Sequence, residues 1–541
     1  MRRTAIMGVL MGLAASAPAW AAHDTLAVGM VQFPQDLHPY SPNSVAKLVV
    51  LRAGLRTVTV NDGLKTVCQL CTTLPTFENG GVKIVTRSDG VDTMEVTYTL
   101  RPDLFWADGE PVTATDVAFG FQIGQWLQPQ RLITGVAAID PHVFQVKIGA
   151  VRADYADLIP SPISEHVEGA IARAAHDPQT YLRRSAFTRA PETPGLWMGP
   201  YRIGESKPDT ITLLPNQYWK GEPLAFKSIA LKLIESTAVL QSKLNSGEID
   251  MPMPEAGLSQ PQVFALAAKP GSRFDVSFIA TTNIEHLVVN LDNKALADRR
   301  VRQAIMLGID RPAIIAKVLD GHAEIADSSL NANDFGFDPN VRKYRYDPRA
   351  ARALLAEAGY KPGVAGVMTN AAGQRLSFEL SSVNDNKESD QIEQLVQGQL
   401  KGIGVELVIK NEPTVILFGG SLRFRTFPGL VLTGALRGAS QLPPLTTAQI
   451  PVDGNNHTGA NYAGFSNAEL DAAVTAATSE LDLAKRAALI ARIQQIEAEE
   501  LPNLPLFFVM RSFVVPKWLG GVLPVQASLV ATSRIEDWRA K

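Results

Sequence analysis

The sequence predicts an α/β protein made of several domain-sized units. Its 541 residues correspond to about three or four units of roughly 150 residues each. Hydrophobic residues make up 46% of the chain and charged residues 19%, which is typical of a globular protein and not of a disordered one. Buried strand-like runs alternate with capped amphipathic helices in both halves, and this alternation favours sheets covered by helices on both faces.

Residues 1–21 have the features of a secretory signal peptide. Arg2 and Arg3 precede a short apolar run, and the segment ends in Ala19-Trp20-Ala21, a small-x-small cleavage site. We expect cleavage after Ala21, and no cysteine stands there to carry a lipid anchor. The sequence therefore predicts a periplasmic protein that has no integral membrane segment once the signal is removed.

Residues 82–121 predict a hairpin followed by a capped helix. The strand-like run KIVT is separated from MEVTYTL by a turn at Ser88-Asp89-Gly90. Thr113 and Asp116 then have the spacing of a capping box, in which two side chains satisfy free N–H groups of the first helical turn. We therefore interpret Asp108 and Asp116 as turn and cap residues rather than as catalysts.

Residues 286–321 predict a buried strand and two consecutive helices. The strand covers His286 to Leu291 and is too continuously apolar for a ribbon that faces solvent. Asp298 can cap the first helix and Asp310 the second, because aspartate accepts hydrogen bonds from the free N–H groups of a first turn. Gly321 then offers the left-handed stop of the second helix.

Further caps mark the elements that follow. Asp347 precedes a proline and a helix that closes at Gly359. The S-x-x-E motif at Ser466 predicts the start of another helix, and a second helix is expected at about 483–500. Residues 506–509 are apolar and predict a strand. The α/β alternation therefore continues to the C-terminal region.

No enzyme motif is present in the sequence. The chain has no G-x-S-x-G, no Walker A loop and no H-E-x-x-H, and its eight histidines are far apart. The formal net charge of −3 and the lack of a basic stripe exclude a typical nucleic-acid binder. We therefore expect a monomeric binding protein without catalytic residues, metal or cofactor.

Cys68 and Cys71 are the only cysteines. In an oxidising compartment such a pair is expected to form a local disulfide that stiffens a loop. A redox-active pair would be followed by a helix, whereas Thr72-Thr73-Leu74-Pro75 is a poor helix former. One C-x-x-C motif cannot complete a tetrahedral zinc site. We favour a structural bridge, and a periplasmic thiol oxidoreductase is the alternative from another functional class.

Two stretches carry a family resemblance. Residues 101–121, RPDLFWADGEPVTATDVAFGF, follow a hallmark of the extracytoplasmic solute-binding proteins of family 5 almost residue for residue. These proteins serve peptide-type ABC importers and include receptors for peptides, nickel and opines. A second hallmark, N...VRQA....ID.........G, is matched at Asn290, Val301, Arg302, Gln303, Ala304, Ile309, Asp310 and Gly321.

The resemblance implies a bilobal periplasmic binding protein of type II, cluster C. It would have two α/β lobes, a two-strand hinge and an extra subdomain on the first lobe. The corresponding ranges are the signal peptide 1–21, lobe I 22–60, a satellite subdomain 61–185, lobe I 186–283, lobe II 284–505 and lobe I 506–541.

The resemblance also implies a function. The protein would capture a short peptide or a peptide-like or opine-like solute in the cleft between the lobes, which close around it like a clamp. A ligand that touches both lobes binds the closed state better and shifts the population toward it. The closed form would then dock on an inner-membrane ABC transporter, formed by a permease and an ATPase.

Six residues are candidates for the ligand site. Gln32 and Phe33 follow the first strand, where a surface turn is the alternative, and Asn461 and Tyr462 follow a glycine-containing loop. Peptide receptors of the family carry an acidic residue that pairs with the peptide's α-ammonium group. The corresponding stretch here, 430–444, has no acidic residue but contains an arginine. The hypothesis is that Arg437 and Ser440 face the cleft and favour a carboxylate or phosphate on the ligand. The alternative is that Arg437 is exposed to solvent or paired within the protein.

The nickel branch of the family provides an alternative that is closer to the peptide receptors than a thiol oxidoreductase is. A metal-chelate receptor of the same fold would use His38, His322 or His457.

Overall fold

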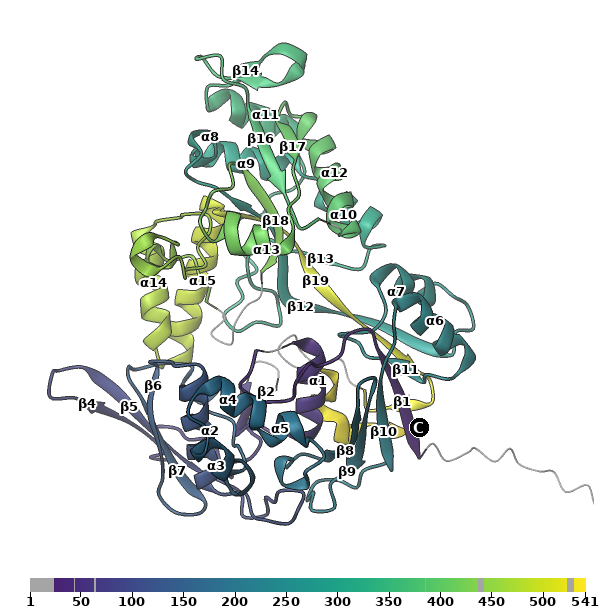
Figure 1. Ribbon diagram of the computed structural model, residues 1–541. Helices are drawn as coiled ribbons and strands as arrows, with labels where there is room; N and C mark the ends of the chain where they lie inside the picture. Colours follow the sequence, from purple (N-terminus) through teal and green to yellow (C-terminus); the bar gives the residue numbers. More distant parts are fainter. Residues whose placement is uncertain (1–23, 43, 63–64, 385, 436–441, 523–529) are drawn as a thin grey trace, which may run out of the picture.

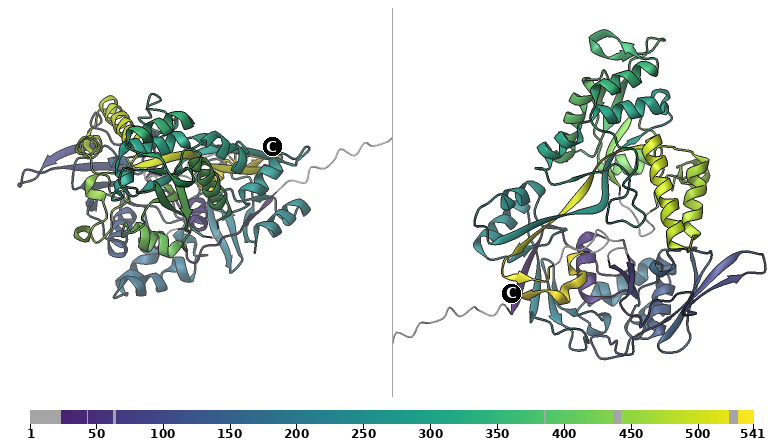
Figure 2. Two further views of the ribbon diagram at one scale, coloured as in Figure 1. Left: turned by 90° about the horizontal axis from the view of Figure 1, so that it is seen from above. Right: turned by 180° about the vertical axis from the view of Figure 1, so that it is seen from behind.

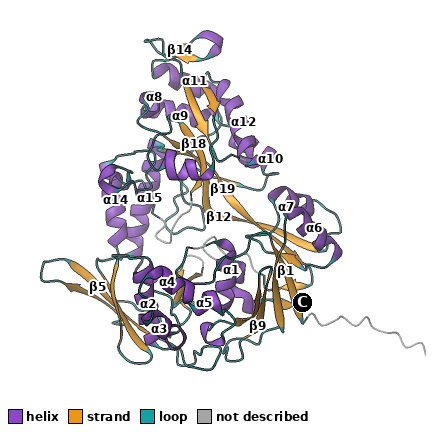
Figure 3. Cartoon of the chain, in the orientation of Figure 1, coloured by secondary structure: helices purple, strands orange, loops and turns teal. Residues whose placement is uncertain are grey.

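The computed structural model describes residues 24–541 except 43, 63–64, 385, 436–441 and 523–529. Two lobes lie one above the other and are joined by two long antiparallel strands, β12 (Phe274–Val289) and β19 (Asn503–Pro516) (Figure 1). The view from behind in Figure 2 shows the same pair of strands running from one lobe into the other. Both lobes combine helices and strands (Figure 3), as the sequence predicts.

Lobe I is built on a five-stranded sheet in the order β11-β1-β10-β9-β8. The first strand, β1, pairs in parallel with both β10 and β11, and its inward residues Val28 and Met30 are fully buried. The C-terminal segment also belongs to this lobe, because Thr532 Oγ1 donates a hydrogen bond of 2.7 Å to Val49 O. The elements are β1 (Thr25–Met30), α1 (Val45–Gly54), β8 (Tyr201–Lys207), β9 (Thr210–Pro215), β10 (Ser228–Leu233), α6 (Thr237–Ser246), β11 (Met251–Pro252), α7 (Gln260–Ala267) and the 3-10 segment η7 (Ala531–Asp537).

A smaller antiparallel sheet, ordered β4-β5-β7-β6, forms a satellite of lobe I. Its helix α2 begins with the predicted capping box, since Asp116 accepts a hydrogen bond of 2.8 Å from Thr113 N. Gly120 of this helix lies directly against the backbone of residues 161–163. The elements are β4 (Val82–Thr86), β5 (Asp92–Thr99), α2 (Ala114–Leu127), β6 (Ile133–Ala138), β7 (Val143–Ile148), α3 (Glu165–Arg173), α4 (Pro178–Arg184) and α5 (Ala186–Arg189).

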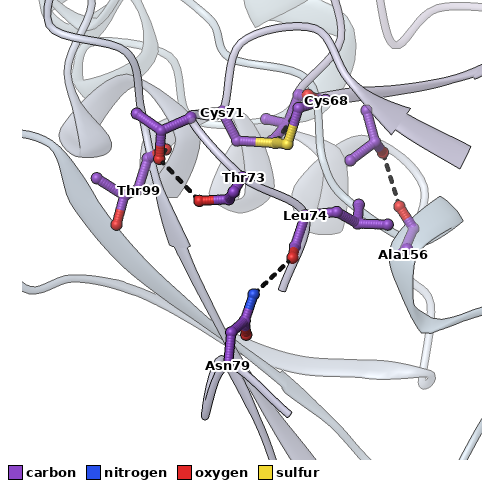
Figure 4. Close-up of a disulfide and its surroundings, with 10 residues drawn as sticks. Cys68, Cys71, Thr73, Leu74, Asn79, Thr99 and Ala156 are labelled. Atoms are coloured by element: carbon purple, nitrogen blue, oxygen red, sulfur yellow. Dashed lines mark hydrogen bonds between the residues drawn. A yellow bond between two sulfur atoms is a disulfide. The ribbon is translucent and has the colours of Figure 1, made fainter. Parts of the chain in front are cut away.

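A disulfide joins Cys68 to Cys71 next to this satellite (Figure 4). Cys68 ends β3 (Lys65–Cys68), which pairs with β2 (Thr59–Asp62), and Cys71 forms an isolated bridge with Leu100. The chain then enters turns in which Asn79 Nδ2 donates to Leu74 O at 2.9 Å. No helix begins at Cys71, so the arrangement expected of a redox-active pair is absent from the described segment 65–81.

Lobe II contains a six-stranded mixed sheet in the order β13-β19-β12-β18-β16-β17. Its first helices agree with the prediction, because Asp298 caps α9 (Arg299–Gly308) and Asp310 caps α10 (Arg311–Val318). A short helix, α8 (Lys294–Ala297), precedes α9. The other main elements are β13 (Glu324–Ile325), α11 (Pro348–Glu357), β14 (Lys361–Pro362), β15 (Met368–Thr369), β16 (Ser377–Ser381), α12 (Lys387–Lys401), β17 (Glu406–Ile409), α13 (Thr414–Ile416), the π-helical segment η4 (Leu417–Leu422), β18 (Leu430–Ala435), α14 (Ala468–Ser479) and α15 (Leu483–Glu500).

The hinge strands are longer than the sequence predicts. The expected strand 286–291 is the end of β12, which begins at Phe274 and pairs with β19 from Phe274↔Pro516 to Val288↔Asn503. Its first half is less buried than its second half, although Phe274, Val276 and Phe278 alternate with polar residues as in a strand, and pairing with β19 keeps it extended. The ladder is irregular between Ala280 and Ile284 and again at Glu285/His286. Both chain crossings between the lobes therefore lie side by side.

Helices α14 and α15 form a hairpin with its own apolar core. The cap predicted at Ser466 is wrong: Asn467 caps α14 by accepting a hydrogen bond of 2.9 Å from Leu470 N. Asparagine and serine are equally good caps, so the sequence motif alone could not choose between neighbouring positions. Ser466 Oγ instead bonds to Thr447 Oγ1 at 2.9 Å.

Arg302, from the second family hallmark, joins α9 to the end of α15. Its side chain is 3% exposed and donates to Leu296 O at 2.8 Å, Ala297 O at 2.9 Å and, through Nε, Glu500 O at 2.9 Å. Gln303 Nε2 donates to Glu499 O at 3.0 Å. The last carbonyls of a helix have no partner within the helix, so these two side chains cap α15 from outside.

We predict that Arg302→Met lowers the free energy of unfolding by about 2–3 kcal/mol, because several buried carbonyls lose their donor. Arg299→Met is the matched control. Arg299 lies one turn earlier on α9 and makes only an exposed ion pair of 2.7 Å with Glu500. Its loss should cost no more than about 0.5 kcal/mol. Urea unfolding followed by circular dichroism measures both values, and equal losses would contradict the capping role.

Replacing each of two helical glycines with alanine should change the stability of the protein in opposite directions. In Gly120→Ala the new Cβ would collide with the Ser161 carbonyl, and we expect a loss of about 1–3 kcal/mol. In Gly398→Ala, within α12, the Cβ would meet nothing within 4 Å, so the gain in helix propensity should stabilise the protein by about 0.5–1 kcal/mol. Thermal unfolding of both variants tests this, and stabilisation by Gly120→Ala would refute the close packing.

Candidate functional site

A cavity of about 300 Å³ lies on one face of the lobe II sheet, next to the hinge. Because side chains alternate along a strand, Ile284, His286 and Val288 of β12 point to this face. Thr433 lies opposite His286 on β18, and Pro505 lies opposite it on β19. The hinge strands therefore form the floor of the cavity at the place where their ladder becomes irregular.

The walls of the cavity come from five segments that are separate in sequence. They are mostly apolar. Tyr462 packs half-buried against the apolar cluster formed by Val288, Leu417, Leu422, Phe427 and Val431. Phe418 is 42% exposed and leaves an aromatic surface at the wall. The wall residues are Asp327, Ser328, Ser329, Phe418, Leu422, Pro443, Pro444, Leu445, Ala460, Tyr462, Glu497 and Ala498.

The polar groups of the cavity are held in position by neighbouring side chains, of which Arg311 is buried and Arg345 exposed. Asp327 forms ion pairs with Arg311 at 2.8 Å and with Arg345 at 3.6 Å. Arg311 is itself buried and also donates to Tyr344 O at 2.6 Å, and burial lowers the pKa of its guanidinium group. Ser329 Oγ donates to the Glu497 carboxylate. The wall can therefore offer oxygen acceptors to a ligand without rearrangement.

Of the six predicted ligand residues, the structure places Tyr462 in the cavity wall. Gln32 is exposed and Phe33 packs half-buried on the core of lobe I, and neither lines the cavity. Arg437 and Ser440 lie outside the described residues. The prediction for Asn461 is corrected, because its side chain is fully buried.

Asn461 supports the loop instead of facing a ligand. It is fully buried, and its Nδ2 donates to Leu445 O and Thr446 O at 3.0 Å and to Phe465 O at 2.7 Å. Its Oδ1 accepts from Phe465 N at 3.1 Å. With donors and acceptor used by the backbone, the amide has nothing left to offer to a solute.

The three histidines considered for nickel lie in separate places. His38 is buried in lobe I, where its Nε2 is hydrogen-bonded to Tyr181 Oη at 3.1 Å. Burial is the larger cause and the positive charge of Lys47 the smaller cause that lower the pKa of His38 to about 3. His322 stacks on Phe278 with ring centroids 3.9 Å apart, and His457 pairs with Asp453 at 2.8 Å. The described residues contain no group of three histidine, cysteine or acidic side chains suited to a metal ion.

The sequence analysis missed His286, Ser329, Phe418 and Glu497 as lining residues. His286 could have been found, since it starts the predicted strand 286–291 and lies on the same face of it as Val288. The other three come from loops and a helix end, whose meeting depends on the tertiary fold. None of the helices in the described parts of the chain has the length and apolarity to cross a membrane.

Comparison with known proteins identifies the family. Residues 87–428 match the family model of bacterial extracellular solute-binding proteins, family 5 Middle. Oligopeptide-binding protein AppA of Bacillus subtilis is 26% identical over 328 residues, which cover 60% of this chain and 58% of that protein. The nickel-binding periplasmic protein of Escherichia coli is 24% identical over 334 residues, 58% of this chain and 60% of that protein. The matched region thus spans less than two thirds of either relative.

A solved structure agrees over nearly the whole chain. The oligopeptide-binding protein from Thermus thermophilus, complexed with a pentapeptide, superimposes with a TM-score of 0.70 at 24% identity. The superposition covers 96% of each chain and shows that the fold is that of the bilobal binding proteins. Together with the family model, these findings show that the chain belongs to the bacterial extracellular solute-binding proteins of family 5.

Proposed function

We propose that this protein is the periplasmic substrate-binding component of a peptide-type ABC importer. It captures a short peptide or a peptide-like or opine-like solute between its lobes and delivers it to the permease and ATPase of an inner-membrane transporter. The observation that carries the proposal is the position of the cavity, whose floor is formed by the two strands that connect the lobes.

This position couples binding to closure. A ligand seated on lobe II gains contacts with lobe I only when the lobes approach, so it binds the closed state more tightly and raises its population. The irregular pairing from Ala280 to His286 gives the strands a place to bend. Because His286 and Ile284 line the cavity at that place, bending and binding involve the same residues.

The size and chemistry of the cavity favour a small ligand with both apolar and hydrogen-bonding parts. A volume of about 300 Å³ stands at the lower end of the roughly 300–1,000 Å³ common for ligand pockets. Phe418 and Tyr462 suit an apolar side chain, while Ser329, Thr433 and Asn503 suit the amide groups of a peptide backbone. The positions of His38, His322 and His457 give no support to the nickel alternative.

The solute can be identified by native mass spectrometry of protein purified from its own periplasm. We expect a bound mass of a short peptide or peptide-like compound. Small-angle scattering of the stripped protein should then show a decrease in radius of gyration when this compound is returned. Leucine alone at the same concentration is the control. A scattering profile that is unchanged by every compound recovered from the periplasm would refute capture by closure.

Tyr462→Ala should weaken binding of the recovered solute about tenfold, which corresponds to about 1.4 kcal/mol. The reason is that an aromatic wall of the cavity is removed. Tyr346→Ala is the matched control, because Tyr346 is also in lobe II but is 45% exposed and lies outside the cavity lining. Isothermal titration calorimetry measures both, and equal affinities for the two variants would remove Tyr462 from the site.

A further inference from the structure

The lobes touch at a second place, far from the hinge. The tip of the α14–α15 hairpin of lobe II rests on the segment between β7 and Asp157 in the satellite of lobe I. Figure 1 and the rear view in Figure 2 both show the lower ends of these helices over the satellite, on the other side of the molecule from β12 and β19. The two lobes are therefore connected by the hinge strands on one side of the molecule and are in contact at this junction on the other.

A backbone hydrogen bond crosses the junction. Ala153 N donates to Thr478 O at 2.9 Å. Thr478 lies in the last turn of α14, where the carbonyl groups have no partner within the helix. One of these free carbonyls is thus capped by the other lobe, and separation of the lobes would return it to water. Leu481, in the turn of the hairpin, packs against the core of lobe I and adds an apolar contact.

Arg486 brings a positive charge to the same junction. It lies in the second turn of α15, with its guanidinium group over the ring of Phe335 at 5.5 Å. Burial lowers the pKa of Arg486, and the carboxylates of Asp154 and Asp157 act in the opposite direction. Within the described residues Arg486 makes no ion-pair contact, and its Nε is buried without a hydrogen-bond partner. Arg486 therefore interacts electrostatically with two carboxylates of the other lobe, next to the backbone contact between Ala153 and Thr478, and forms no ion pair with them.

The two carboxylates differ in what they can still bind. Both oxygens of Asp154 accept hydrogen bonds of 2.7 Å from Arg152. Asp157 accepts one hydrogen bond of 2.9 Å, from Thr66, through Oδ1. Among the described residues no donor bonds to its Oδ2, which is therefore available to Arg486. Burial raises the pKa of Asp157, while this arginine lowers it. A direct contact would satisfy both groups, as charge-assisted hydrogen bonds in a partly buried site do.

We propose that this junction is a latch, formed by Thr478, Leu481 and Arg486 of lobe II with Ala153 and Asp157 of lobe I, and that Arg486 contacts Asp157 when the lobes close fully. The latch holds the closed state at the end of the cleft opposite the hinge. It sets the ratio of closed to open receptor and, through that ratio, the apparent affinity for the solute. This inference rests on the proposed capture by closure.

The test uses the ligand-free full-length protein with spin labels at Gln130→Cys in lobe I and Ala476→Cys in lobe II. Both sites are exposed, and the native cysteines are joined to each other. Electron–electron double resonance gives the populations of short and long distances between the lobes. We expect Arg486→Ala to lower the closed-to-open ratio about two- to five-fold, the usual effect of one partly exposed ion pair.

Lys485→Ala is the matched control. It removes the same charge from the neighbouring, exposed position of α15, so it should leave the distance distribution unchanged. The charge-exchanged protein Arg486→Asp/Asp157→Arg should recover the closed population, which also excludes a folding defect as the cause. Identical distributions for Arg486→Ala, Lys485→Ala and the parent protein would overturn the latch.

The two proposals can fail separately. If the solute recovered from the periplasm still reduces the radius of gyration of Arg486→Ala while the ligand-free distances do not change, the latch is wrong and the clamp stands. If the distances respond to Arg486→Ala but no recovered solute closes the parent protein, the junction controls an opening motion and the receptor function is wrong.

Discussion

The ladder between β12 and β19 is the constraint on which the rest of the structure depends. These strands belong to the lobe II sheet at one end, while at the other Phe274 and Val514 pack against α6 and α7 of lobe I. A continuous antiparallel pair resists shear, because slipping by one residue would turn every side chain to the opposite face. Bending is easier than shear, since bending at the irregular pairs breaks few hydrogen bonds. The lobes can thus approach and separate without losing their register.

Lobe II is made rigid by buried arginines whose partners are mainly backbone carbonyls. Arg302 caps the end of α15, and Arg311 joins the 326–327 loop to Tyr344. Both lie beneath elements that carry cavity residues, namely α15 with Glu497 and the loop with Asp327. A guanidinium group can satisfy several carbonyls at once, which a shorter or apolar side chain cannot. These contacts therefore fix the backbone beneath the cavity wall.

Much of the fold could be predicted because its signals are local. The caps at Asp298, Asp310 and Thr113 each depend on a few neighbouring residues, and the structure agrees with them. The cavity depends on contacts between distant segments: the sequence named Tyr462, which lies in its wall, but gave no sign of Ser329 and Glu497. Asn461 shows the remaining difficulty: its sequence neighbourhood looks like a binding loop, but its amide is used by the backbone. A polar residue reveals its role only when its partners are known.

The return of the C-terminal segment to lobe I has a consequence for biogenesis. Phe513, Ile535 and Trp538 are part of the main core of lobe I, next to residues from the first hundred positions of the chain. Lobe II is contiguous in sequence. All strands of its sheet except β19 are synthesised before the C-terminal residues that complete lobe I. A polypeptide that emerges N-terminus first must therefore keep the first lobe unfinished, with apolar surface uncovered, until its last residues arrive. The core of lobe I is therefore completed later in synthesis than the core of a domain that is contiguous in sequence.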